Sequence, residues 1–340
     1  MSRQQRIWAA IMLLGIAHGT VLLAGYLVPY DPSVQDREYP FAPPTRLHFV
    51  DSRGRFHLRP FVYRIAGSDA SDGYIEDTAE TFPLRFFADN GAAGENSGAG
   101  SRHHLFGVKM PGRIFLLGTD EFGRDQFSRL LYGGRISLFA GLAAAAVSLG
   151  LGLVLGALAG FYGRWVDEII MRLAELFLAL PWLYCLLAFR AFLPLHITPS
   201  GVFIMLILVI GAVGWARVAR LIRGAVLSAK ERNYVLAARG FGASSFRLVS
   251  RHVLPETYGI VLTQGALLIP QYILAEVTLS FLGLGAGEPA PSWGSMLASL
   301  QRYHVLVSYR WMLAPGIALA VLVFLYYVLA NALQERGSST

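Results

Sequence analysis

Six long stretches of the chain consist almost entirely of apolar residues, and polar segments separate them. A helix needs about 20 apolar residues to cross a bilayer, and each stretch is close to that length or longer. A polar segment, residues 31–134, follows the first stretch, and a basic segment, residues 217–256, follows the fourth. The pattern predicts six transmembrane helices, at residues 7–28, 136–162, 169–195, 200–216, 258–284 and 311–333, with approximate bounds for the third to the fifth.

The composition agrees with a protein embedded in a membrane. Of the 340 residues, 54% are hydrophobic and 15% are charged, and the mean hydropathy is +0.48. In soluble domains about a quarter of the residues are charged. The first apolar stretch exceeds the core of a secretory signal, about 7–15 residues, so we expect an uncleaved helix there. The single cysteine, Cys185, excludes an intramolecular disulfide.

The basic residues gather in one segment instead of spreading along the chain, whose formal net charge is +7. Residues 217–256 hold eight Lys or Arg against two Glu, whereas residues 31–129 hold twelve Lys or Arg against fourteen Asp or Glu. Loops rich in Lys and Arg stay in the cytoplasm, while long loops cross largely regardless of charge. We therefore expect residues 31–134 outside the cell membrane, both termini in the cytoplasm, and no nucleic-acid partner.

The outer segment contains a predicted β-hairpin. LHFV (47–50) and RFHLRPFVYRI (55–65) are typical of strands, and DSRG between them is typical of a turn. Residues 66–101 are rich in Gly, Ser, Ala, Asp and Asn, which predicts an irregular loop. The expected organisation is a helix in residues 1–30, an insertion in 31–134, a five-helix core in 135–334 with its cytoplasmic loop at 217–256, and a tail in 335–340.

The second predicted helix carries small residues at four-residue intervals. Ser148, Gly152, Gly156 and Gly160 fall on one helix face. Such a stripe lets a neighbouring backbone approach closely, so it predicts a helix contact.

The basic segment contains a compact motif, YVLAARGFGASSFRLVSRHVLPE (234–256). It predicts a helix over 234–239, a turn of small residues, and a second helix that ends at Leu254-Pro255. The spacing resembles the coupling loop of ABC-transporter permeases, which reads Glu-Ala-Ala, three residues, Gly, nine residues, an aliphatic residue, any residue, Leu-Pro. Leu236 stands where that family usually has Glu, and His252 where it often has Ile. The matching residues are Ala237, Ala238, Gly242, Leu254 and Pro255.

The resemblance implies that this loop docks on a cytoplasmic ATPase subunit. Small side chains let a short helix sit deep in a partner's groove, and nearby arginines can pair with partner carboxylates or with anionic lipid. The alternative is an ordinary cytoplasmic loop whose arginines only set the topology; the fixed spacing favours coupling. The candidate coupling residues are Arg232, Leu236, Ala237, Ala238, Arg239, Gly242, His252, Leu254 and Pro255.

Three further segments resemble one group of these permeases. They are GTDEFGRDQFSRLLYGGRISL (118–138), GFYGRWVDEIIMRLAELFLALP (160–181), and LSFLGLG with PSWG (279–285 and 291–294). They look like the second, C-type permease subunit of the dipeptide, oligopeptide and nickel group. Together with the coupling loop, this resemblance extends over the first helix and over the chain from about residue 115 to its end. Residues 41–114 match the group poorly.

The resemblance implies a fold and a set of partners. The fold is an all-α polytopic membrane protein with six helices, the ABC importer type I permease fold, here with a partly β extracytoplasmic insertion. The partners are a second homologous permease, two cytoplasmic ABC ATPases, an extracytoplasmic solute-binding protein and membrane lipid, in a bacterial inner membrane. Peptide import is favoured. The alternatives are nickel or another small solute carried by the same machinery, or an ATP-independent membrane channel.

Several catalytic motifs are absent from the sequence. A phosphate-binding loop reads G-x-x-x-x-G-K-[ST], but neither lysine of the chain, Lys109 or Lys230, follows a glycine. H-E-x-x-H and G-x-S-x-G are absent too, which weighs against a zinc protease or a serine hydrolase. We expect no catalytic residue and no cofactor on this chain, with ATP and Mg²⁺ bound by partner subunits.

Charged residues mark two further candidate sites. In GTDEFGRD four of them are close enough in sequence to form a local network, interpreted as a brace at the outer surface beside the translocation mouth. A metal site there is less favoured, because histidine or a denser carboxylate cluster would be expected, and we predict no metal. The residues of this outer brace are Asp120, Glu121, Arg124 and Asp125.

Two carboxylates lie inside predicted membrane helices, where charge is costly and usually faces protein or water. Glu276 is predicted to face the pathway or the partner permease. Glu175 lies one turn beyond Arg172, so it forms either a structural pair with that residue or part of the pathway.

Overall fold

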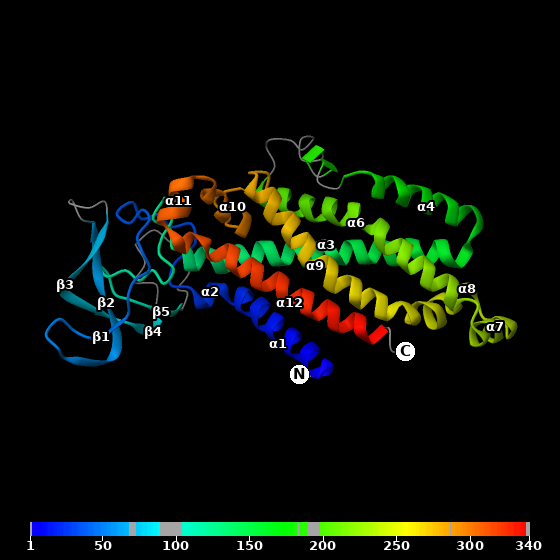
Figure 1. Ribbon diagram of the computed structural model, residues 1–340, viewed down its shortest axis with the longest axis horizontal. Helices are drawn as coiled ribbons and strands as arrows, with labels where there is room; N and C mark the ends of the chain where they lie inside the picture. The colour runs from blue at the N-terminus through cyan, green and yellow to red at the C-terminus, as the bar shows by residue number, and fades with distance from the viewer. Residues whose placement is uncertain are drawn as a thin grey trace. The chain divides into compact units, whose positions relative to one another are not determined.

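The chain folds into two compact units, which are described separately. The computed structural model describes residues 2–67, 73–88, 104–181, 184–185, 187–188, 198–285 and 287–337 (Figure 1). The helical unit consists of Met1–Leu14, Leu138–Leu279 and Val321–Thr340. The strand-bearing unit consists of Gly15–Ser137 and Ser280–Ala320.

The long helices are those expected of a polytopic membrane protein. They are α1 (Arg3–Leu22), α3 (Gln126–Tyr162), α4 (Arg164–Ala179), α6 (Pro199–Ala229), α9 (Tyr258–Phe281) and α12 (Ala314–Gly337). Within the described residues, five helical segments are long and apolar enough to cross a membrane: Arg3–Leu22, Gln126–Tyr162, Gly201–Ala229, Ser245–Phe281 and Arg310–Glu335. The third predicted span, residues 169–195, lies partly outside the described residues, and α4 covers only its first part.

The stripe of small residues on α3 packs against α6. A Cβ atom added to Gly152 would lie 2.4 Å from Val218, and one added to Gly156 would lie 2.5 Å from the carbonyl oxygen of Ala219. The hydroxyl of Ser148 donates a hydrogen bond to the carbonyl oxygen of Gly211, at 2.7 Å. The predicted close contact of two helix backbones is therefore confirmed.

Helix α4 packs against α6 through both apolar and charged contacts. The rings of Phe177 and Trp215 meet edge to face, with centroids 5.7 Å apart. Near the start of α4, the carboxylate of Asp167 pairs with the guanidinium of Arg223. These contacts fix the walls of the cavity described below.

Helix α6 extends 13 residues beyond its predicted end at residue 216. Basic residues at 217, 220 and 223 suggested that the helix had ended, yet Val218, Ile222 and Val226 are fully buried. Their spacing of four residues continues one apolar helix face, so the basic residues occupy the opposite face of the same helix. The loop between α6 and α9 is consequently shorter than the sequence indicates.

The strand-bearing unit contains two small antiparallel sheets. β2 (Phe56–Gly67) lies between β1 (His48–Val50) and β3 (Tyr74–Pro83), and β4 (Arg85–Ala88) pairs with β5 (His104–Gly107). The shorter helices of this unit are α2 (Ala24–Leu27), α10 (Trp293–Ala298) and α11 (Tyr303–Ser308), with single turns at η4 (Ser299–Gln301) and η5 (Arg310–Leu313). A buried apolar cluster supports it: Val62, Phe82, Leu84, Val108 and Ile114.

The turn between β1 and β2 is organised by Asp51. Its carboxylate accepts hydrogen bonds from the backbone N–H groups of Arg53 and Arg55, both at 2.9 Å, and lies 3.1 Å from the His57 ring. These bonds favour the ionised form and hold the pKa of Asp51 below its usual value. The strands lie where the sequence predicts a hairpin.

The prediction of an irregular loop over residues 66–101 is wrong for the part described. β3 and β4 cover residues 74–83 and 85–88. Most positions of β3 are exposed, and its sequence lacks the alternating apolar pattern of a half-buried strand. Backbone pairing with β2 specifies this strand instead.

Candidate functional site

The first candidate site is the loop between α6 and α9, here called the coupling surface (residues 232–257). Helix α7 (Asn233–Gly240) opens it, and helix α8 (Ser245–Leu248) follows a short turn. One side of the coupling surface is anchored to the rest of the protein, because its residues Val235, Leu248 and Val253 are buried. The opposite side is exposed and is free to contact a partner.

The turn between the two helices depends on Gly242 and Ser244. Gly242 has φ of +83°, which glycine adopts without a steric penalty. The backbone N–H of Ala243 bonds back to the carbonyl oxygen of Ala238, at 3.1 Å, and closes the end of α7. The hydroxyl of Ser244 accepts a bond from the N–H of Arg247 and caps α8. A sharp, well-defined corner results.

The prediction that the second helix ends at Leu254-Pro255 is wrong. A π-helical turn, η2 (Val249–Val253), and a 3₁₀ turn, η3 (Leu254–Thr257), carry the chain directly into α9. Proline lacks an N–H group and cannot complete a regular α-helical ladder, but a wider turn followed by a tighter one accommodates it. The coupling surface is therefore continuous with a membrane helix.

All nine predicted coupling residues lie on the accessible part of this surface. Leu236, Ala237, Arg239, Gly242 and Pro255 are exposed, as is Arg232, and the other three are partly exposed: Ala238, His252 and Leu254.

Two aromatic side chains of the coupling surface were missed by sequence reasoning. Phe241 is 92% exposed and Phe246 is 82% exposed, on either side of the glycine turn. Large apolar side chains so exposed on an anchored turn are candidates for contact with another protein or with lipid. The sequence signal for them was their position beside Gly242, since an aromatic residue next to a tight turn is held at the surface.

Charged contacts stiffen the two ends of the coupling surface. Arg232 lies 3.3 Å from the carboxylate of Glu256, which also accepts a 2.8 Å hydrogen bond from the hydroxyl of Tyr234. The guanidinium of Arg239 lies over the ring of Phe161, 5.9 Å from its centroid. The two ends of the surface are thus tied to each other, and α7 is tied to the end of α3.

The second candidate site is a cavity of about 470 Å³ among α4, α6 and α9. An adjoining cavity of about 460 Å³ shares several lining residues with it. The walls are mostly apolar, and two exposed polar side chains, Arg217 and Gln271, line both cavities. An apolar hollow with a few polar groups has the character of a small-molecule site.

The two carboxylates predicted for the pathway have different surroundings. Glu276 is only 1% exposed, and the described lining of the cavity includes its neighbour Ala275 but not Glu276 itself. Glu175 is exposed and lies 3.6 Å from Arg172, so the structural pair forms. Arg217 and Gln271 were missed because sequence alone does not reveal which helix faces border a cavity.

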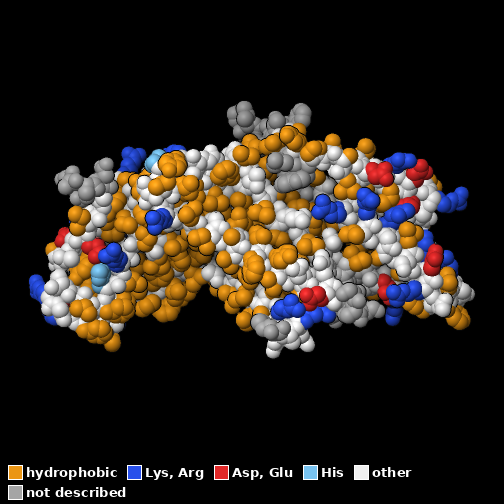
Figure 2. All heavy atoms as spheres, viewed as in Figure 1, with side chains coloured by type: hydrophobic (Ala, Val, Ile, Leu, Met, Phe, Trp, Pro, Cys, Tyr) orange, Lys and Arg blue, Asp and Glu red, His pale blue; other side chains and the backbone are white. Residues whose placement is uncertain are grey.

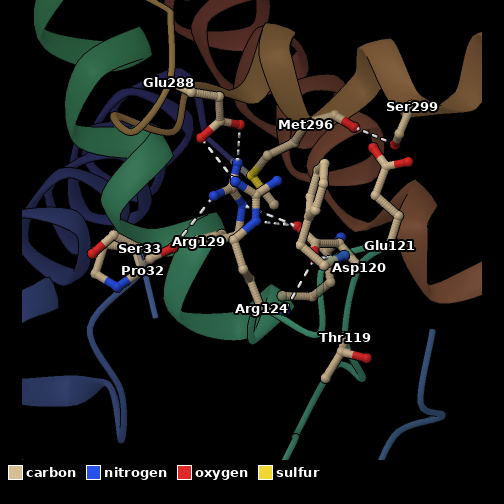
Figure 3. Close-up of polar contacts among 12 residues, drawn as sticks. Pro32, Ser33, Thr119, Asp120, Glu121, Arg124, Arg129, Glu288, Met296 and Ser299 are labelled. Carbon is tan, nitrogen blue, oxygen red and sulfur yellow. Dashed lines mark hydrogen bonds and ion pairs between the residues drawn. The ribbon is translucent and has the colours of Figure 1, made fainter. Parts of the chain in front are cut away.

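The third candidate site is the predicted outer brace in the strand-bearing unit. Arg124 donates to the carboxylate of Asp120 at 2.7 Å and to Glu288 at 2.8 Å. Arg129, only 2% exposed, donates to the other oxygen of Glu288 at 3.1 Å. Figure 3 shows both guanidinium groups pointing toward Glu288. Glu121 pairs with Arg302 instead, so the brace joins three separate parts of the chain.

Asp125 does not take part in this charge network, contrary to the sequence prediction. It is buried at the N-cap of α3, where its Oδ2 accepts hydrogen bonds from the N–H and the hydroxyl of Ser128, at 2.8 Å and 2.6 Å. Burial disfavours the carboxylate and raises its pKa to about 7, against the opposing effect of the Ser128 bonds. In the part of the chain that the structure describes, no three His, Cys, Asp or Glu lie together as metal ligands.

Known proteins resemble this chain at the level of sequence. It is 38% identical over 219 residues to the dipeptide transport system permease protein DppC of Bacillus subtilis (strain 168), covering 64% of this chain and just under two thirds (66%) of that protein. It is 36% identical over 228 residues to the oligopeptide transport system permease protein OppC of the same organism, covering 67% and 72%. Among solved structures, the inward-facing MetNI methionine ABC transporter gives a TM-score of 0.48 at 17% identity, over 60% of this chain and 94% of that one. Residues 152–338, more than half of the chain, match the model of a family described as "Binding-protein-dependent transport system inner membrane component".

Proposed function

Because the chain belongs to the family of binding-protein-dependent transport system inner membrane components, we propose that it forms half of the translocation pathway of an ABC importer and couples to ATPase subunits through residues 234–255. The family consists of permease subunits that work with ATPases and substrate-binding proteins. The other half of the pathway comes from a second, homologous permease. ATP is bound and hydrolysed by two partner subunits, since this chain has no phosphate-binding loop.

The proposed cargo is a dipeptide or an oligopeptide. Support comes from the relatives, which are named as dipeptide and oligopeptide permeases. The cavity lined by Arg217 and Gln271 is compatible with such a cargo, because a guanidinium and an amide can pair with the carboxylate and the amide groups of a peptide.

The proposed topology has six spans, with both termini in the cytoplasm and the insertion outside. The basic faces of α6 and of the coupling surface support a cytoplasmic location for residues 217–256. Residues 169–195 are proposed as the third span, which with the five apolar helical segments brings the number to six.

The observation that carries this proposal is the connection of the coupling surface to both sides of the cavity. Helix α6 leads into the surface and supplies Arg217 to the cavity, and α9 leaves the surface and supplies Gln271. When ATPases close around ATP and push on residues 234–255, they move two cavity walls at once. Alternating access to the pathway follows, and the chemistry is done by the partners.

Substitution of Gly242 tests the coupling surface. A Cβ atom at Gly242 meets no other atom within 4 Å, so the added bulk of Gly242→Trp starts in open space, while its positive φ strains the backbone of any other residue. We expect normal membrane insertion but loss of ATPase co-purification and of ATP-driven uptake.

Two variants control for side effects. Gly242→Ala imposes the same left-handed backbone on a non-glycine residue without the bulk, so it should retain most of the docking. Gly240→Trp adds the same bulk two residues earlier, where a Cβ atom again meets no atom within 4 Å but φ is not positive. It therefore separates the effect of bulk from that of backbone strain. Undiminished co-purification of the ATPase with Gly242→Trp would refute the proposed contact.

A further inference from the structure

The β4–β5 hairpin is attached to the ends of two candidate membrane helices. His104, the first residue of β5, donates from Nδ1 to the carbonyl oxygen of Val28, which follows α2, at 2.6 Å. The ring of Phe106 in β5 lies 6.3 Å from that of Phe127, in the first turn of α3. Helix α1 ends just before α2 and α3 begins at Gln126, so these contacts hold the hairpin where two apolar helices terminate.

The hairpin presents two large aromatic side chains on its surface. Phe86 is 61% exposed and Phe87 is 66% exposed. The apolar residues Leu22 and Leu23, at the end of α1, are exposed as well. Phe87 connects the aromatic side chains of the hairpin with the apolar residues that follow α1, because its ring lies 6.5 Å from that of Tyr26 in α2. Figure 2 shows hydrophobic side chains gathered over the region where Figure 1 labels α2 and β4.

The backbone at Phe87 is strained. Its φ is +55°, a left-handed conformation that a bulky residue rarely adopts. Such strain persists only where the surrounding structure requires it, and it often marks a functional position. At Phe87 the described ring contact is with Tyr26 in α2, just beyond the candidate membrane helix α1.

Basic residues accompany the aromatic pair. Arg85 precedes Phe86 and pairs in the ladder with Gly107, and Lys109 lies two residues beyond Gly107; both basic side chains are exposed. Aromatic rings flanked by Lys or Arg are typical of a surface at the boundary between water and lipid, where the rings reach the acyl chains and the cations meet anionic headgroups.

From this geometry we propose that the β4–β5 hairpin is an interfacial anchor, whose Phe86 and Phe87 insert into the lipid headgroup region beside the end of α1. The occupant of this apolar surface is lipid, since the surface continues the exposed apolar end of a candidate membrane helix. The hairpin lies outside residues 152–338, which the family model matches, so the anchor belongs to the insertion. The proposal rests on α1 and α3 crossing the membrane and is independent of cargo and of ATPase docking.

Spin labelling of the full chain in vesicles of phosphatidylcholine and phosphatidylglycerol tests the anchor. All variants carry Cys185→Ser, and a nitroxide is attached after Phe86→Cys, after Leu22→Cys as the lipid reference, or after Thr78→Cys, an exposed polar position of β3, as the water reference. The measurement is the accessibility of the label to dioxygen relative to a water-soluble nickel chelate. We expect a ratio at Phe86 several-fold above that at Thr78 and approaching that at Leu22.

Two other outcomes overturn the anchor. A ratio equal to that at Thr78 means that the hairpin lies in water. A label shielded from both reagents means that protein, either this chain or a second copy of it, covers the surface instead of lipid. If the cysteine variant does not fold, Phe86→Trp keeps an aromatic ring and adds fluorescence that lipids brominated near the headgroup should quench; quenching no stronger than for Thr78→Trp also refutes the proposal.

Discussion

At the scale of single residues, Asp125 makes stability depend on pH. In the unfolded chain its carboxyl ionises at the usual pKa near 4, whereas in the folded protein the pKa is raised to about 7. Below about pH 4 both states hold the proton. Between about pH 4 and pH 7 only the folded state holds it, so the free energy of unfolding falls as the pH rises; above pH 7 the loss is complete.

We therefore predict that Asp125→Asn flattens this dependence. Between pH 5 and pH 7 the wild-type protein should lose about 2 kcal/mol relative to the variant, because the full slope is about 1.4 kcal/mol per pH unit and the folded carboxyl is already half ionised at pH 7. Thermal unfolding of the purified protein between pH 5 and pH 8.5 provides the measurement. Asp77→Asn, at an exposed position of β3, should leave the profile unchanged. If stability depends on pH in the same way for the wild type and Asp125→Asn, the raised pKa of Asp125 is contradicted.

The outer brace illustrates what the sequence predicts about single residues. Asp120 and Arg124 are four residues apart, and their pairing was predictable from that spacing. Glu288 is separated from Arg124 by 164 residues, and only the folded chain brings the two together. The sequence does not distinguish Asp125 from Asp120, yet Asp125 is buried and caps the start of α3. Spacing predicts local pairs, but distant partners and burial need the tertiary structure.

At the scale of elements, the contact between α3 and α6 should be intolerant of side chains at Gly156. We expect Gly156→Leu to destabilise the protein by about 1–3 kcal/mol or more, because its Cβ would meet the Ala219 carbonyl oxygen, and a backbone atom cannot move aside as a side chain can. Gly150→Leu is the matched control: it lies on the same helix and meets nothing within 4 Å. Thermal melting of the purified variants measures the difference, and equal melting temperatures would argue against tight packing at this stripe.

The predicted elements differ from the observed ones mainly where two signals compete. The end of α6 was placed too early because its charged face was taken for a loop, although the apolar face continues to Val226. A helix end was predicted at Pro255 because proline breaks a regular helix, but η2 and η3 absorb the break. The small-residue stripe on α3 was predictable, since close helix packing depends on residue size and helical spacing alone.

At the scale of the whole molecule, the proposed role of the coupling surface requires a partner. Its exposed Phe241 and Phe246 would be removed from water in the proposed contact with an ATPase subunit. The surface follows α6 after a turn at residues 230–232 and leads into α9, and both helices border the cavity. In the proposed mechanism, movement of the surface would reach the cavity walls through these two helices.

Transport should consequently require the complete assembly. We predict that vesicles containing this chain alone take up no peptide, and that uptake appears only when the second permease, the ATPases, the solute-binding protein and ATP are all present. ATPases that cannot hydrolyse ATP serve as the control and should abolish uptake while leaving the assembly intact. Peptide binding to the solute-binding partner, compared with nickel binding, identifies the cargo separately from the energy source. Uptake by this chain alone, unchanged when the ATPases are removed, would instead establish an ATP-independent channel, because energy would then not enter through residues 234–255.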